Sequence, residues 1–315
     1  MQSHAETRHV LAISACLMLA AACVSPGNQS PGQSAQPSSP RVSSSSPAAP
    51  EVDDSSPAIT GVDVVERMYD VGGHKLFMSC AGSGSPTVVY LHGWINDAWI
   101  SPHANGEHIR RHLTDHRVCL YDRRNVGSSQ TVDAVQTHQD MLRDMERVLV
   151  AGDVDPPYIL MAASFGGLLA YSYLNHHPDD VVGMVLIDAM FPDELALDRY
   201  LPQRYRFVAY AKEDSCCSLE RIPQHPMVRD LQRYIGEEPD IPVIYLASKL
   251  EPRDVNDYGS PEYDRRVLTA QADYVDRFSP GKVRWVDAPH FMEPVVPDEI
   301  ADAVREVATM ARHRS

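Results

Sequence analysis

Two almost wholly apolar runs, residues 87–91 and 182–187, most constrain what this chain can fold into. Strands that are apolar along their whole length are typical of the centre of a parallel sheet, because helices cover both of its faces. Other short β-branched runs alternate with amphipathic segments, which is the pattern of an α/β sheet. We therefore predict an α/β fold with strands at residues 64–69, 75–80, 87–91, 117–121, 158–163, 182–187, 242–247 and 282–286.

Two helices between and after these strands can be located from their ends. Thr137 and Asp140 have the spacing of a capping box, and apolar residues follow at helical spacing over residues 141–149. Gly152 then ends that helix. Pro297 opens a last helix with its own apolar stripe.

The beginning of the chain has the pattern of an export signal. An apolar stretch at residues 10–22 follows a short polar segment, and it is shorter than the roughly 20 residues of a membrane-spanning helix. Small residues directly precede Cys23, as in bacterial lipoprotein signals, in which that cysteine is lipidated. Cys16 ends a second, lower-ranked candidate motif, and ordinary cleavage after Ala22 is a third possibility. We expect an exported protein, either a cell-envelope lipoprotein anchored outside the cytoplasm or a secreted protein.

A Ser/Pro-rich tract follows the signal. Between positions 25 and 57, 18 of 33 residues are Ser or Pro, and we expect this tract to be disordered because it has too little apolar surface to bury. The predicted organisation is a signal at residues 1–22, a tether at 23–60 and a folded domain at 61–315. The net charge of −15 argues against nucleic acid and against charge-driven membrane binding, so we expect membrane contact through a lipid anchor only. No protein partner is evident.

Ser164 is the candidate nucleophile. It lies between the predicted strand at 158–163 and a predicted helix, in the sequence Ala-Ala-Ser-Phe-Gly-Gly. This is a looser form of the G-x-S-x-G turn that exposes a serine on a sharp strand-to-helix connection, with Ala162 in its first position. The plainer alternative is a Ser-Gly turn without a catalytic role.

Two further segments carry groups that acyl transfer needs. Its oxyanion is stabilised by two backbone N–H groups, which we assign to Trp94, in the loop after the strand at 87–91, and to Phe165, next to Ser164. His290 lies between the last strand and the last helix, where it would act as general base.

The acid that orients His290 has three candidates. Glu251, four residues after the strand at 242–247, is favoured, and Asp254 follows it closely. Asp188, at the end of the strand at 182–187, is the other alternative. Either Asp or Glu would orient the imidazole and stabilise its charged form.

These features together resemble the α/β-hydrolase superfamily over residues 64–311. The segment at 121–129 also looks like that family's D-R-x-G-x-G-x-S motif, with Asn125 in place of the first glycine. The resemblance implies an eight-stranded, mostly parallel sheet with a Ser–acid–His site. In the family the aspartate at the position of Asp188 is often not catalytic, which favours Glu251. The family's strand order also implies that Cys80 and Cys119 are neighbours and form a disulfide.

The same resemblance places a small helical cap at about residues 190–240. Its aromatic residues could form a lid over an apolar pocket, or they could simply pack the cap onto the core. The leading hypothesis is an exported carboxylesterase acting on small or medium esters through Ser164, Glu251 and His290. The alternatives are an amide-cleaving, peptidase-like hydrolase and a non-catalytic binding protein on the same scaffold. We expect no cofactor and no metal, since Cys216 and Cys217 lack zinc-ligand spacing.

Overall fold

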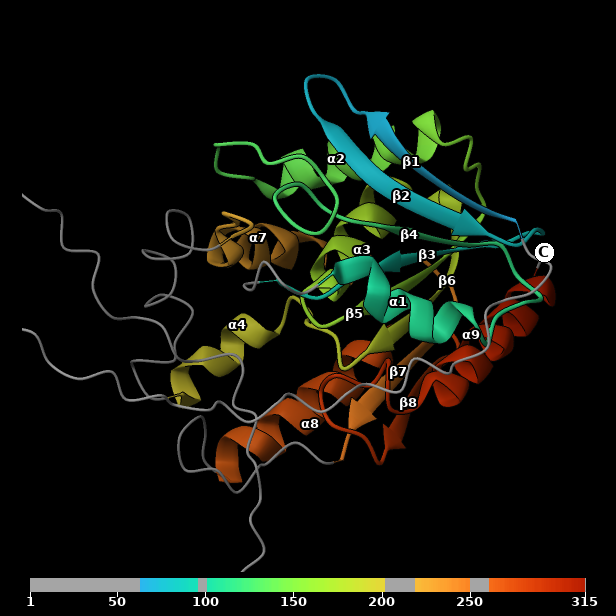
Figure 1. Ribbon diagram of the computed structural model, residues 1–315. Coiled ribbons are helices and arrows are strands. Elements are labelled where there is room, and N and C mark those ends of the chain that lie inside the picture. The colour runs from blue at the N-terminus through green and yellow to red at the C-terminus, as the bar shows by residue number, and fades with distance from the viewer. Residues whose placement is uncertain (1–62, 96–100, 202–218, 250–260, 315) are drawn as a thin grey trace, which may run out of the picture. The chain divides into compact units, whose positions relative to one another are not determined.

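The computed structural model describes residues 63–95, 101–201, 219–249 and 261–314 (Figure 1). Its eight-stranded sheet has the order β1-β2-β4-β3-β5-β6-β7-β8. β2 pairs antiparallel with both β1 and β4, and all other neighbouring strands pair parallel. The strands are β1 Val64–Asp70, β2 Lys75–Ala81, β3 Thr87–Leu91, β4 Val118–Tyr121, β5 Tyr158–Ala163, β6 Val181–Ile187, β7 Val243–Ser248 and β8 Gly281–Val286. The predicted α/β class is therefore confirmed, and each strand lies within one residue of its predicted bounds at either end.

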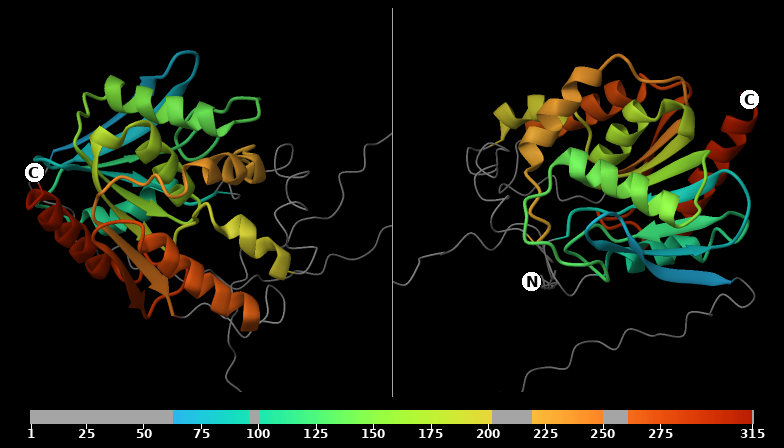
Figure 2. Two further views of the ribbon diagram at one scale, coloured as in Figure 1. Left: turned by 180° about the vertical axis from the view of Figure 1, so that it is seen from behind. Right: turned by 90° about the horizontal axis from the view of Figure 1, so that it is seen from above.

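Helices cover both faces of the sheet, as the apolar central strands require. Ile159 and Met161 of β5 face the core beneath α1 (Pro102–Arg110) and α9 (Pro297–Arg312). Leu160 and Ala162 face the opposite core, beneath three other helices. These are α2 (His138–Ala151), α3 (Gly166–His176) and α8 (Pro261–Val275), and Figure 2 shows the elements from behind and from above.

The helix predicted after Thr137 is α2, and its capping box is formed. The Thr137 hydroxyl accepts a hydrogen bond from the Asp140 N–H (3.2 Å), and the Asp140 carboxylate accepts one from the Thr137 N–H (2.9 Å). An N-terminal cap of this kind contributes about 1 kcal/mol. Gly152 ends the helix, where its N–H donates to the Val148 carbonyl (3.0 Å).

The connection between β6 and β7 contains short helices among its described residues. It contains α4 (Glu194–Leu197) and α7 (Gln224–Leu231), with short 3₁₀ turns at Asp198–Tyr200 and Gln232–Tyr234. This is where the cap was predicted. Most of its predicted aromatic residues lie at 202–218, outside the described residues.

Cys80 and Cys119 form the expected disulfide. They are directly opposite each other in the antiparallel register of β2 and β4, with Cα atoms 4.1 Å apart. The strand order β2-β4 therefore creates the pair, as the family resemblance implied.

The predicted signal and tether lie outside the described residues, as do Cys23, Glu251 and Asp254. Export and lipidation consequently remain predictions. Within the described part of the chain, none of the helices combines the length and the apolar character needed to cross a membrane.

Candidate active site

Ser164 occupies a strained turn between β5 and α3. Its φ of +48° is in the left-handed region that residues with a side chain rarely adopt. The Ser164 N–H donates to the carbonyl of Ile187 at the end of β6 (3.1 Å), and the Ser164 carbonyl accepts from the Met190 N–H (2.8 Å). These two hydrogen bonds hold the turn against the neighbouring strand, so the predicted strand–turn–helix is present.

The two glycines after Phe165 are required by close backbone contacts. A Cβ added to Gly166 would lie 2.1 Å from the Leu91 carbonyl oxygen, and one on Gly167 would lie 2.4 Å from the Met190 carbonyl oxygen. No side chain fits at those distances. The helix α3 can therefore start close to the end of β3, which brings the loop after β3 beside the serine.

That loop carries Trp94, one of the two residues whose backbone N–H is predicted to bind an oxyanion. A Cβ on Gly93 would lie 3.2 Å from the Ser164 Cβ and 3.8 Å from its Oγ, so the Gly93 backbone lies against the serine. Trp94 directly follows Gly93 in the chain. Phe165 directly follows Ser164 and is fully buried. The buried indole Nε1 of Trp94 has no hydrogen-bond partner among the described residues.

His290 lies in the loop after β8 and is paired with Asp188. The distance from its Nδ1 to the Asp188 Oδ2 is 2.8 Å. The other carboxylate oxygen, Oδ1, accepts a hydrogen bond from the Ser248 N–H of β7 (3.3 Å). The Asp188 side chain is 11% exposed and that of His290 is 36% exposed, so the carboxylate is held beneath the more accessible imidazole.

The backbone places Asp188 at the end of β6, beside both β7 and the turn that carries Ser164. Its N–H donates to the Leu246 carbonyl of β7 (2.8 Å), and its φ of +40° turns the chain sharply after β6. Because Ser164 is hydrogen-bonded to Ile187, the residue before Asp188, the serine turn and the Asp188–His290 pair meet at the same end of the sheet. Of the three acids considered from the sequence, Asp188 is the one that lies within the described residues.

A second carboxyl, Glu194 of α4, lies near this pair. The pKa of Glu194 is raised to about 8, chiefly by burial; a backbone hydrogen bond at Phe191 opposes this shift, and the nearby Asp188 carboxylate contributes to it. Sequence reasoning missed this residue, because a single glutamate in a cap segment looks the same as a solvated one.

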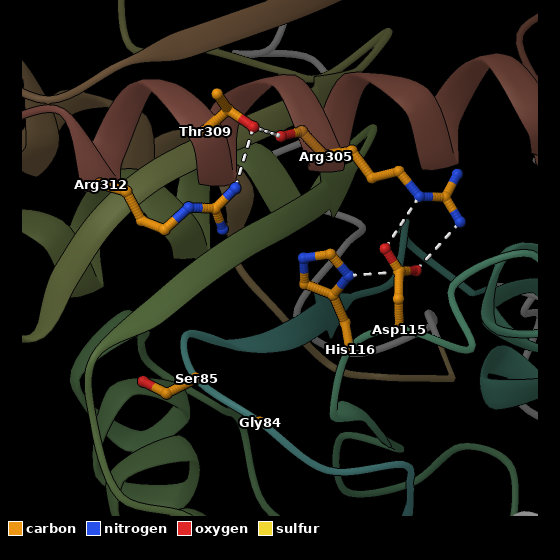
Figure 3. A pocket seen from close by; sticks show the side chains of 7 residues that line it. All are labelled: Gly84, Ser85, Asp115, His116, Arg305, Thr309 and Arg312. Carbon is orange, nitrogen blue, oxygen red and sulfur yellow. Dashed lines mark hydrogen bonds and ion pairs between the residues drawn. The ribbon is translucent and has the colours of Figure 1, made fainter.

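A cavity of about 310 Å³ lies elsewhere, at the amino end of β3 (Figure 3). Its two arginines both have partners: Arg305 pairs with Asp115 (3.0 Å), and Arg312 donates to the Thr309 hydroxyl (3.0 Å). Ser164 and Asp188 follow the carboxyl ends of their strands, so this cavity is separate from the candidate site. No group of three or more His, Cys, Asp or Glu side chains in the described ranges is arranged to hold a metal ion.

Comparison with known proteins gives a consistent picture of the fold. Residues 86–220 match the family described as alpha/beta hydrolase fold. A proline iminopeptidase of Aeromonas sobria is 29% identical over 140 residues, covering 39% of this chain and 33% of that protein. The uncharacterized protein YqjL of Bacillus subtilis is 33% identical over 76 residues, covering 24% of this chain and 30% of that protein. The chain thus spans about a third of the length of these two relatives.

Among solved structures, the epoxide hydrolase VrEH1 from Vigna radiata superposes with a TM-score of 0.57 at 13% identity. The match covers 78% of this chain and 98% of that chain, and identity this low indicates the fold alone. The strand order, the helices on both faces and the matched segment agree with one another. The described domain therefore has the α/β-hydrolase fold.

Proposed function

We propose that this protein is a serine hydrolase in which Ser164 is the nucleophile, His290 the general base and acid, and Asp188 the acid that orients His290. The observation that carries the proposal is the hydrogen bond between His290 Nδ1 and Asp188 Oδ2, next to a serine held at positive φ. A carboxylate on Nδ1 fixes the tautomer and stabilises the imidazolium, as in other serine hydrolases.

The proposed reaction assigns one step to each of these groups. Ser164 Oγ attacks the carbonyl carbon of the substrate while His290 Nε2 takes the hydroxyl proton. The N–H groups of Trp94 and Phe165 stabilise the oxyanion of the tetrahedral intermediate. The protonated imidazole then gives its proton to the leaving alcohol, and an acyl-enzyme remains on Ser164. Water then attacks this ester while His290 takes a proton from it. The imidazolium returns the proton to Ser164 Oγ, and the carboxylic acid is released.

The substrate class that we favour is a small or medium carboxylic ester. The alternative is cleavage of an amide next to an amino group. Glu194 lies near the Asp188–His290 pair and, with its pKa raised to about 8, would bind a substrate ammonium in its ionised form. The similarity of part of the chain to a proline iminopeptidase agrees with that alternative. A p-nitrophenyl ester and an amino-acid p-nitroanilide separate the two. Glu194→Gln should raise the KM of the anilide alone if Glu194 binds the amine.

A fluorophosphonate probe tests the serine-hydrolase proposal itself. It should label the wild-type protein and fail to label Ser164→Ala, which removes the nucleophile while leaving the fold intact. Absence of labelling in correctly folded wild-type protein would favour the non-catalytic scaffold instead.

The cellular location is proposed from the sequence alone. We propose that the protein is exported and carries a lipid on Cys23, with the Ser/Pro-rich tract as a spacer between the membrane and the enzyme. Mass spectrometry of the mature N-terminus tests this: an unmodified Cys23, or a different first residue, would contradict it.

A further inference from the structure

A buried arginine contacts the loop that carries the proposed oxyanion hole. Arg123, which follows β4, is 2% exposed, and its Nη1 donates to the His92 carbonyl while its Nη2 donates to the Gly93 carbonyl, both at 2.8 Å. Its guanidinium also lies over the Phe165 ring, 5.2 Å from the centroid. Arg123 therefore touches both segments whose N–H groups would stabilise the oxyanion.

Glu220 holds this arginine in place. Its Oε2 accepts from Arg123 Nε (2.7 Å) and its Oε1 accepts from Arg123 Nη2 (2.9 Å), a bidentate pair that fixes the plane of the guanidinium. Oε1 also accepts from the Ile95 N–H (2.7 Å), in the loop after β3 that carries Trp94, here called the oxyanion loop. Glu220 is fully buried and comes from the connection between β6 and β7. The carboxylate thus links the cap connection to the loop after β3.

His92 donates a second hydrogen bond to the Gly93 carbonyl. Burial and the neighbouring Arg123 charge hold the pKa of His92 well below its usual range, so the ring is neutral. Its Nε2 accepts a hydrogen bond from the backbone N–H of Arg123 (3.2 Å). Nδ1 therefore carries the proton and donates to the Gly93 carbonyl (2.7 Å). The Gly93 carbonyl oxygen therefore accepts two hydrogen bonds, one from Arg123 and one from His92.

These contacts determine how the next N–H points. The C=O of Gly93 and the N–H of Trp94 belong to one planar, trans peptide, so they point in opposite directions. Because the carbonyl is directed at Arg123 and His92, the Trp94 N–H is directed away from them. The Gly93 backbone lies against Ser164, so this peptide is placed where a tetrahedral intermediate would form.

We propose that Arg123, held by Glu220, is a positioning residue that orients the Trp94 amide of the oxyanion hole. This inference rests on the proposed serine-hydrolase function. Loss of the guanidinium fork would let the Gly93–Trp94 peptide rotate, and a misdirected amide would no longer meet the oxyanion. The effect should fall on the transition state rather than on substrate binding.

The test compares Arg123→Lys and Glu220→Gln with a matched control, Arg124→Lys. Arg124 is the next residue, is also buried and also pairs with an acid, through Nε to Asp144 Oδ2 (2.7 Å), but that pair does not include the oxyanion loop. The kcat and KM for a p-nitrophenyl ester are measured per active site titrated with fluorophosphonate, together with Tm and inhibition by phenylboronic acid, which forms a tetrahedral adduct with a nucleophilic serine.

We expect Arg123→Lys to lower kcat by about 10- to 1,000-fold with little change in KM, since deletion of a whole oxyanion donor costs about 10²- to 10³-fold. Boronate inhibition should weaken with it. Glu220→Gln should do the same to a smaller extent, and Arg124→Lys should keep kcat within about threefold even if its Tm falls.

Two results would overturn the positioning role. One is a wild-type kcat per titrated site in both Arg123→Lys and Glu220→Gln. The other is a loss of activity that matches the loss of folded, titratable protein, which would leave Arg123 a purely structural role. Failure of the wild-type protein to react with fluorophosphonate is a different result, because it would contradict the proposed function itself.

Discussion

Removal of the Cys80–Cys119 disulfide should lower the stability of the domain by an amount that the chain separation sets. The two cysteines are 39 residues apart, and the entropy of closing a loop of that length in the unfolded chain corresponds to about 4 kcal/mol. Measured values for single disulfides are commonly about 2–4 kcal/mol. At about 2–4 °C per kcal/mol for a domain of this size, the double variant Cys80→Ser/Cys119→Ser should unfold about 5–15 °C below the oxidised protein.

Thermal unfolding followed by circular dichroism measures this difference. The reduced wild-type protein serves as a second route to the same state, so it should unfold close to the serine variant, and reductant should leave the variant unchanged. A serine variant that unfolds within about 2 °C of the oxidised wild type would refute the entropic reasoning. A reductant effect of equal size on the variant would show that another cysteine is responsible.

Two further predictions concern the candidate site. Gly166→Ala places a Cβ 2.1 Å from the Leu91 carbonyl oxygen, so we expect a loss of about 1–3 kcal/mol in denaturant unfolding and a lower kcat; a variant as stable and active as wild type would contradict that contact. The pKa of Glu194 is raised from 4.5 to about 8, so its ionisation costs stability as pH rises through that range. The Tm of Glu194→Gln should therefore rise relative to that of the wild type as the pH is raised from 5 to 9. If the Tm of both proteins changed with pH in parallel, the raised pKa of Glu194 would be refuted.

The sheet could be predicted closely because its strands are bounded by clear changes in pattern. The run at 87–91 is almost wholly apolar and is buried at every position as β3, and the run at 158–163 is likewise buried throughout as β5. The serine turn and the position of His290 followed from the same strand boundaries. The disulfide additionally needed the strand order, which the family resemblance supplied.

The acid could not be settled from the sequence, because several carboxylates follow strands at the same end of the sheet. The place of Glu251 after the predicted strand at 242–247 and the family resemblance favoured it, but Glu251 lies outside the described residues together with Asp254. The pairing of Asp188 with His290 depends on a positive φ after β6 and on the packing of β6 against β7. Neither feature has a signature in the sequence.

The role of Glu220 was equally inaccessible. Its sequence neighbours carry no motif, and its importance arises only because the connection between β6 and β7 places it beside Arg123. Arg123 itself lies in the D-R segment that supported the resemblance, but its contacts with the Gly93 carbonyl and the Phe165 ring required the structure.

The most direct test of the central claim is the turnover of Asp188→Asn beside Glu251→Gln and Asp254→Asn. The amide in Asp188→Asn keeps the shape of the side chain but removes the charge that orients His290, so kcat for a p-nitrophenyl ester should fall by about 10⁴-fold. Glu251→Gln and Asp254→Asn should each stay within about tenfold of wild type. A near-normal kcat in Asp188→Asn with a collapse in Glu251→Gln would contradict the proposed Ser164–His290–Asp188 site.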